Sequence, residues 1–185
     1  MKRLFIIISV LSCTALACNS NSSTEPKTDT ATTDTTATTM NASKTDMAAK
    51  NKETALAAQQ SVNNHDADAV MKYAASDMVD YGDGSTPPAK GIDSCKAFLK
   101  GFLTAFPDIK GENFMAISEG NHVAVFGDWS GTFKGEMMGM KPTGKSFKVK
   151  DVDLFTFNDE GKITEHRSVQ SSEIMMMQVG AKMKK

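Results

Sequence analysis

The sequence predicts an α+β domain, with helices first and a curved antiparallel sheet after them. Up to Pro107, apolar residues recur at the spacing of a helix, whereas beyond it they alternate with polar residues. Short turn sequences separate the alternating segments, which is typical of strands joined as a meander. A group of helices followed by a group of strands predicts a sheet that wraps around the helices.

The first half of the domain contains three expected helices and one short strand. Asp66 can cap the second helix with its side chain. In the third helix, large apolar residues recur three and four positions apart from Phe98 to Phe106, and Pro107 ends it. In chain order we expect helices over 47–62 and 66–73, a strand over 78–81, and the third helix from Asp93 or Ser94 to 106.

The second half contains four expected strands. They are separated by Glu-Gly-Asn, a glycine-rich loop and Asn-Asp-Glu-Gly, all of which favour turns. The segment after the last strand is expected to form a short helix, across a pocket or at a dimer face. In chain order the strands are expected over 114–118, 122–133, 145–157 and 162–171.

The first 17 residues are expected to be a signal peptide. Lys2 and Arg3 precede an apolar run of about 14 residues, which is short for a transmembrane helix. The run leads into Ala-Leu-Ala-Cys at 15–18, which resembles the cleavage site of bacterial lipoproteins. Cys18 is therefore expected to carry lipid. The alternative is ordinary secretion with an unmodified cysteine.

The tract after Cys18 is expected to be a disordered tether. It is rich in threonine and almost free of large apolar residues, so it cannot bury enough surface to offset the entropy lost on ordering. A flexible coil of this length reaches roughly 30 Å. We therefore expect a protein of the cell envelope, lipid-anchored to a bacterial membrane and facing the periplasm or the outside. Its expected parts are a signal peptide over 1–17, a lipidated cysteine and tether over 18–46, a folded domain over 47–180 and a basic tail over 181–185.

The charge balance limits the partners. The chain has 21 basic and 22 acidic residues, and loss of Lys2 and Arg3 with the signal peptide changes the net charge from −1 to about −3. This balance does not indicate a surface for binding nucleic acid. Contact with a membrane is expected through the lipid anchor only. If Cys18 is acylated, Cys95 is the last free thiol, so no intramolecular disulfide can form.

One series of motifs resembles the SnoaL-like polyketide or ester cyclases of the nuclear transport factor 2-like superfamily. Ala-Phe-Pro-Asp ends a helix at 105–108, GTFKGEMMGMKPTGK follows at 131–145, and Gly-Lys-Ile at 161–163 precedes Glu165. The resemblance spans about 47–180. It implies a cone-shaped pocket enclosed by the sheet, and a homodimer formed through the outer face of the sheet.

Two carboxylates are the first candidates for catalysis. On the strand over 145–157, alternation places Asp151 and Asp153 on one face together with Phe147, Phe155 and other apolar residues. If this face lines the pocket, burial and mutual repulsion would raise the pKa of at least one of them toward a value useful for acid or base catalysis. The alternative is that the face is partly solvated, or that the acids pair with basic residues on neighbouring strands.

The last strand departs from the pattern of the resembled family. Those cyclases use an aspartate near the end of this strand as the general base, on the same side as a tryptophan. Here Ser171 occupies the position of the aspartate and Arg167 that of the tryptophan. Alternation places Glu165 and Arg167 on the pocket face, where Glu165 could replace the missing base and Arg167 could hold an anionic or enolate oxygen. The opposite, outer face is then polar and suits a dimer contact; it carries Thr164, His166, Ser168 and Gln170.

Further residues are expected to line the pocket and to bind a ligand. Each could equally be a core residue. His65, His122 and His166 are expected on the surface, and no two of them have the spacing of metal ligands, so no metal site is predicted. The expected ligand-binding residues are Asp80, Tyr81, Trp129, Phe133, Met138, Phe155 and Arg167.

Methionine is concentrated in two places. Met137, Met138 and Met140 lie in the glycine-rich loop, and three consecutive methionines occupy 175–177. Thioethers fill irregular apolar space and form adaptable binding surfaces, and they can also bind Cu(I). A pocket for an apolar ligand, a plain core and a copper site are therefore the three alternatives.

Two functions agree with these observations. The first is a tethered, non-catalytic protein that binds a small apolar molecule in a cone-shaped pocket. The alternative is an ester or polyketide cyclase or an isomerase that needs no cofactor and uses Asp151, Asp153 or Glu165 as its base. The absence of the family's late aspartate favours the first, and the presence of these carboxylates supports the second.

The anchor gives the first testable prediction. Replacing Cys18 with Ser should move the protein from the membrane fraction to the soluble fraction of the cell envelope, because the acylated thiol is lost. Cys13→Ser is the matched control and should leave the protein in the membrane fraction. Retention of Cys18→Ser in that fraction would contradict lipid anchoring.

Overall fold

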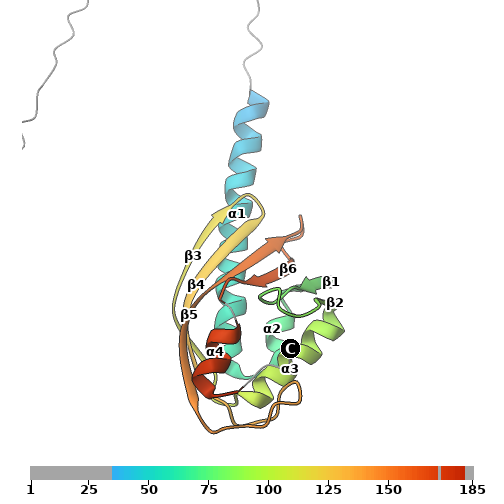
Figure 1. Ribbon diagram of the computed structural model, residues 1–185. Coiled ribbons are helices and arrows are strands. Elements are labelled where there is room, and N and C mark those ends of the chain that lie inside the picture. The colour runs from blue at the N-terminus through green and yellow to red at the C-terminus, as the bar shows by residue number, and fades with distance from the viewer. Residues whose placement is uncertain (1–34, 171, 182–185) are drawn as a thin grey trace, which may run out of the picture. The chain divides into compact units, whose positions relative to one another are not determined.

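The computed structural model describes residues 35–170 and 172–181 (Figure 1). Within this part of the chain, the helices are α1 (Thr35–Ser61), the 3-10 helix η1 (Val62–Asn64), α2 (Ala67–Met71), α3 (Ile92–Ala105) and α4 (Ser172–Val179). The strands are β1 (Ala74–Asp80), β2 (Ala89–Lys90), β3 (Lys110–Glu119), β4 (His122–Thr132), β5 (Ser146–Phe157) and β6 (Ile163–Ser168). The predicted α+β class is confirmed.

The described strands form a six-stranded sheet in the order β2-β1-β6-β5-β4-β3. Neighbours pair antiparallel except β1 and β6, which run parallel. The chain therefore leaves β1, passes through β2 and α3, builds the meander, and returns to place its last strand between β1 and β5. This connection brings residues near position 80 next to residues near position 166.

The sheet is curved and unclosed, and helices occupy its concave side. In Figure 1 it bends around the C-terminal half of α1, with α2 and α3 toward β1 and β2 and with α4 against β5. Apolar residues of these helices form two buried clusters against the sheet. In one of them Phe106, fully buried, stacks on Phe133 and meets Phe147 edge-on, with ring centroids 5.4 and 5.3 Å apart.

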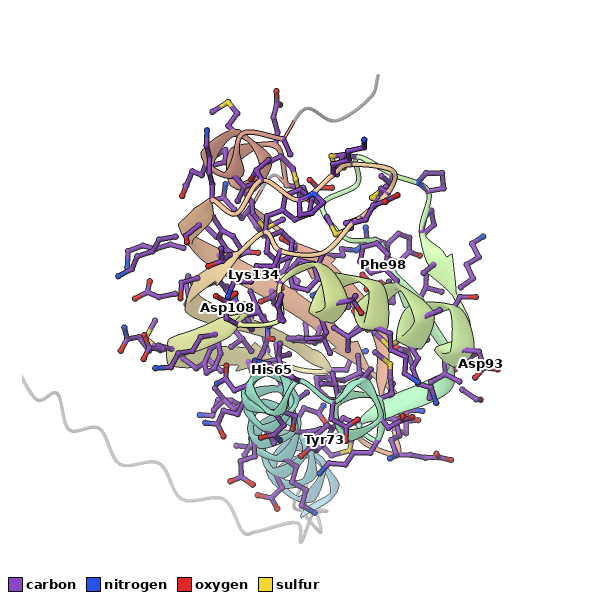
Figure 2. All side chains as sticks on the ribbon, turned by 90° about the horizontal axis from the view of Figure 1, so that it is seen from below. His65, Tyr73, Asp93, Phe98, Asp108 and Lys134 are labelled. Atoms are coloured by element: carbon purple, nitrogen blue, oxygen red, sulfur yellow. The ribbon has the colours of Figure 1, made fainter. Side chains whose placement is uncertain are left out.

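The Phe-Pro-Asp motif after α3 fastens the end of β4. Asp108 accepts hydrogen bonds from the Thr132 amide (2.8 Å) and from Lys134 Nζ (3.1 Å), and Figure 2 shows Asp108 and Lys134 side by side. Although burial opposes ionisation, these bonds lower the pKa of Asp108 to about 2. One residue later, Gly135 passes so close to α3 that an added Cβ would lie 2.3 Å from the Thr104 carbonyl oxygen. The resembled motif thus holds the entrance of the glycine-rich loop against the end of α3.

Several element boundaries differ from the prediction. α1 begins at Thr35 and so includes part of the tract that was expected to be a tether. α3 begins after Gly91, which has φ 81° and makes no side-chain cap, so neither Asp93 nor Ser94 is the N-cap. The Gly91 amide instead donates to the Met78 carbonyl at 2.8 Å, which joins the start of α3 to β1. The two-residue strand β2 was not predicted.

Some predicted features lie outside the described residues. They are the signal peptide, the lipidated Cys18, the first part of the tether, Ser171 and residues 182–185. None of the described helices is both long enough and apolar enough to cross a membrane.

Candidate functional site

A cavity of about 270 Å³ lies between the concave face of the sheet and the helices. Apolar side chains from both buried clusters form most of its wall. Polar side chains enter it from β1, from the adjacent loop, and from β5 and β6. The main apolar lining residues are Val70, Met71, Leu99, Phe102, Trp129, Phe147, Val149, Phe155 and Met176.

At the polar end, the ring of His166 lies between two carboxylates. Its Nδ1 is 2.9 Å from Asp80 Oδ1, and its Nε2 is 2.9 Å from Asp153 Oδ1. The other Asp153 oxygen accepts a short hydrogen bond from Gln59 Nε2 of α1. The imidazole also stacks on Phe155, with centroids 5.1 Å apart. Both ring nitrogens of His166 and both oxygens of Asp153 are therefore engaged inside the protein.

Sheet register produces this arrangement. Asp80 is the direct partner of His166 across the parallel pair, and Phe155 is its partner across the antiparallel pair. Asp153 lies two residues from Phe155 and therefore on the same face. The alternation of β6 is interrupted by a bulge, because Phe157 pairs with Ile163 whereas Thr156 pairs with Glu165. The extra residue, Thr164, shifts every later side chain to the opposite face.

Two carboxylates at 2.9 Å indicate that His166 is an imidazolium, because only the charged ring can donate from both nitrogens. Burial alone would lower the pKa of His166, but the hydrogen bonds to Asp153 and Asp80 raise it to about 10. For Asp80, burial is the largest influence and favours the neutral acid, yet the hydrogen bond and charge of His166 together with the hydrogen bond from the Gly82 amide outweigh it and lower the pKa. The charged histidine and its partners thus form a fixed ionic unit.

Asp151 is in a different state from its neighbours. Its Oδ1 accepts from the amides of Val152 (2.6 Å) and Gln170 (2.7 Å), and its Oδ2 accepts from Ser168 Oγ (2.6 Å). Burial raises the pKa of Asp151, and the negative charge of Asp153 raises it further. No cation forms a described contact with it. Asp151 is therefore a carboxyl group poised for proton exchange inside the cavity.

The comparisons with known proteins decide the family. The sequence profile of the SnoaL-like polyketide cyclases matches residues 52–179, which is well over half of the chain. The chain belongs to the SnoaL-like polyketide cyclase family. None of the curated proteins matches it.

Solved structures share the SnoaL-like fold. AclR from Streptomyces galilaeus, provisionally assigned as a hydroxylase, is 28% identical with a TM-score of 0.60, over 72% of this chain and 82% of AclR. A protein from Jannaschia sp. CCS1, provisionally assigned as a SnoaL-like polyketide cyclase, is 25% identical with a TM-score of 0.64, over 74% and 96% of the two chains. IdmH from Streptomyces antibioticus, provisionally assigned as a polyketide cyclase, shares the fold at 23% identity and a TM-score of 0.58, over 70% and 98%.

The structure brings together some of the site residues predicted for the SnoaL-like domain. On β5, the structure places Phe147, Val149, Asp151, Asp153 and Phe155 in the cavity wall, all on the face that alternation gives them. Among the predicted ligand-binding residues, Asp80, Trp129, Met138 and Phe155 line it as well.

Other predicted positions were wrong. Because of the bulge at Thr164, Glu165 and Arg167 lie on the outer face of the SnoaL-like sheet, 3.6 Å apart in a loose ion pair. The Arg167 guanidinium lies 3.7 Å from the ring centroid of Tyr81. Neither Arg167 nor Tyr81 lines the cavity. Phe133 is fully buried in the core and does not line the cavity either.

Sequence reasoning missed four polar residues of the site. His166 was expected on the outer face together with Ser168 and Gln170, yet all three line the cavity. Gln59 was not considered, although it is buried in α1 and bonded to Asp153. A bulge has no clear sequence signal at Thr164, so strict alternation gave the wrong face. Likewise, nothing in the alanine-rich sequence around Gln59 indicates a hydrogen bond to a residue 94 positions later.

The methionines of the glycine-rich loop and of α4 form part of the cavity wall. Met137, Met138, Met140, Met175 and Met176 line it, whereas Met177 is exposed. Phe98, labelled on α3 in Figure 2, lies in the same wall. Within 35–170 and 172–181, no group of three or more His, Cys, Asp or Glu side chains is arranged to hold a metal ion.

The ionic unit gives a prediction about pH. The pKa of His166 is about 10 in the folded protein and about 6.5 when unfolded. Its contribution to stability is therefore complete below pH 6.5 and is lost as the pH rises through 10. We expect the free energy of unfolding by urea to fall between pH 7 and 9, by at most about 1.4 kcal/mol per pH unit for this one proton.

The matched controls are two histidine variants. His166→Gln should lose this pH dependence, and His122→Gln should keep it because His122 is exposed and bonded only weakly to Thr156 (3.3 Å). Equal slopes for the parent protein and His166→Gln would show that the ring is not held as a cation.

Proposed function

We propose that the SnoaL-like domain binds a small apolar molecule in its cavity. The observation that carries this proposal is the cavity itself, about 270 Å³ with a largely apolar wall and a set of hydrogen-bonded polar side chains from β1, β5 and β6. Ligand sites of small molecules combine these features, since apolar walls supply affinity and a few polar groups fix the orientation. The membership in the SnoaL-like family supports the same proposal.

A second candidate function is acid–base catalysis on such a molecule without a cofactor, as in a cyclase or isomerase. The specific observation that favours it is Asp151, whose pKa is raised inside the cavity. Asp153 is paired with the charged His166, whereas Asp151 accepts hydrogen bonds from neutral donors only among its described contacts, which makes Asp151 the better base. Asp151→Asn should then lower turnover of activated carbonyl compounds at least ~100-fold, with Asp128→Asn as the control. Turnover that survives Asp151→Asn would remove this candidate.

Catalysis by Glu165 receives no support from the fold. Glu165 is on the outer face, paired with Arg167, so neither residue can act on a molecule in the cavity. The role of Arg167 in holding an enolate oxygen is withdrawn for the same reason.

We further propose that the domain works in the cell envelope, anchored through lipid on Cys18. Support comes from the sequence alone, in which a basic and apolar leader precedes the cysteine and a threonine-rich tract follows it. A homodimer through the outer face of the sheet is proposed as well. Its support is now the exposed apolar side chains of Ile117 and Leu154 beside Glu165 and Arg167, and no longer the polar face predicted earlier.

The binding function predicts a difference between the two faces of β5. Val149 lines the cavity and Val152 does not. Val149→Phe should occupy cavity volume and weaken binding of the neutral probe 4-phenylbutan-1-ol at least ~10-fold, whereas Val152→Phe should leave it unchanged. Titration calorimetry measures both affinities, and melting temperatures check that both variants fold. An equal effect of the two substitutions would place the probe outside the cavity.

A further inference from the structure

The charged groups of the cavity are unevenly balanced. Among the residues that the structure describes, four aspartates from three segments line it, and they face a single histidine. Neither lysine nor arginine occurs among its described lining residues. The charged lining residues are Asp80 of β1, Asp83 of the loop that follows, Asp151 and Asp153 of β5, and His166 of β6.

The histidine cannot neutralise this excess. Its single positive charge is already shared between Asp80 and Asp153 at 2.9 Å each, which leaves one net negative charge on that unit. With Asp83 and Asp151 ionised, the cavity would carry three net negative charges from four carboxylates and one imidazolium.

The two remaining aspartates are supported by neutral donors. Asp83 accepts from the amides of Ser85 (2.9 Å) and Ser172 (2.7 Å) and from Ser85 Oγ (2.6 Å). Asp151 accepts from two amides and from the Ser168 hydroxyl, as described above. Hydrogen bonds of this kind orient a carboxylate, but they bring no countercharge to it.

We infer that the ligand of this cavity is an apolar organic cation, such as a protonated amine with a hydrocarbon body. The inference rests on the proposed binding function and names the class of molecule that this function serves. The ammonium group supplies the countercharge that Asp151 and Asp83 lack, while the hydrocarbon body contacts the apolar wall. Aromatic rings of Trp129 and Phe155 lie in the same wall and can face a cation with their negatively polarised surfaces.

The same charges select against anions. A ligand carboxylate or phosphate would enter an apolar cavity that already has excess negative charge, where repulsion is poorly screened. The raised pKa of Asp151 agrees with this picture, since burial and the charge of Asp153 both oppose a further negative charge at this position. A bound cation acts in the opposite direction and favours the ionised form of Asp151.

Three probes of matched shape test the inference by calorimetry on the purified protein at pH 7. They are 4-phenylbutylamine, 4-phenylbutan-1-ol and 4-phenylbutanoate, which differ mainly in the charge of one end. We expect the amine to bind at least ~10-fold more tightly than the alcohol, and the carboxylate to bind more weakly than both. Raising the pH through the titration of Asp151 should strengthen amine binding and leave alcohol binding unchanged, because the amine competes with the proton on Asp151.

The variants separate the charge of the cavity from general effects. Asp151→Asn keeps most of the shape and should reduce the preference for the amine over the alcohol at least ~5-fold. Asp83→Asn, at the loop, should reduce the preference by a smaller factor and serves if Asp151→Asn does not fold. The matched control is Asp128→Asn, since Asp128 lies outside the cavity and is already paired with Lys150 at 2.7 Å. That control should keep the full preference.

The outcomes distinguish this inference from the function on which it rests. Equal binding of amine and alcohol would contradict the inference of a cationic ligand, but it would still agree with the proposed binding of a small apolar molecule. Tighter binding of the carboxylate would likewise overturn it. Absence of binding by all three probes would overturn the proposed function, and the inference with it.

Discussion

The arrangement of the site depends on one ion-paired ring. His166 connects β1 to β5 across β6, since its two nitrogens contact Asp80 on one side and Asp153 on the other. Gln59 extends the connection to α1. Removing one member of a buried ionic group leaves its partners uncompensated, which typically costs about 3–5 kcal/mol. The first helix and three neighbouring strands are therefore held in one geometry by groups that also form the polar end of the cavity.

The ionic unit of Asp80, His166 and Asp153 has a structural role, whereas Asp151, two residues from Asp153, is the group available for proton exchange. Asp151 and Asp153 are two positions apart on the same face of β5, yet they differ in their partners. Asp153 is compensated by the imidazolium, whereas Asp151 meets neutral donors only among its described contacts. The pairing of one acid leaves the other as the group whose proton can move. The position of one histidine thus gives two nearby carboxylates of the same pocket different environments.

The sequence was sufficient for the fold and for one wall of the site. The change of hydrophobic period from helical to alternating predicted the order of elements, and the twelve-residue strand β5 kept a regular alternation, so its cavity face was identified correctly. β6 could not be treated in the same way, because an inserted residue at Thr164 reverses the faces and leaves no compositional trace. Asp80 meets His166 through the return of the chain to β1, and Gln59 of α1 meets Asp153 of β5. These contacts over 86 and 94 positions are not contained in local patterns. The charge pairing inside the cavity could therefore be identified only from the three-dimensional structure.

The methionines in the wall bear on how selective the cavity can be. Unbranched thioether side chains change shape at low cost, so the part of the wall formed by Met137, Met138, Met140, Met175 and Met176 can repack around hydrocarbon bodies of different outline. The polar side chains of the cavity, held by ion pairs and hydrogen bonds, have no such freedom. With the cationic ligand inferred above, such a cavity would distinguish molecules by the charge of their head group far more sharply than by the shape of the rest. Its natural ligands would then form a chemical series with a common head and variable hydrocarbon parts, rather than a single compound.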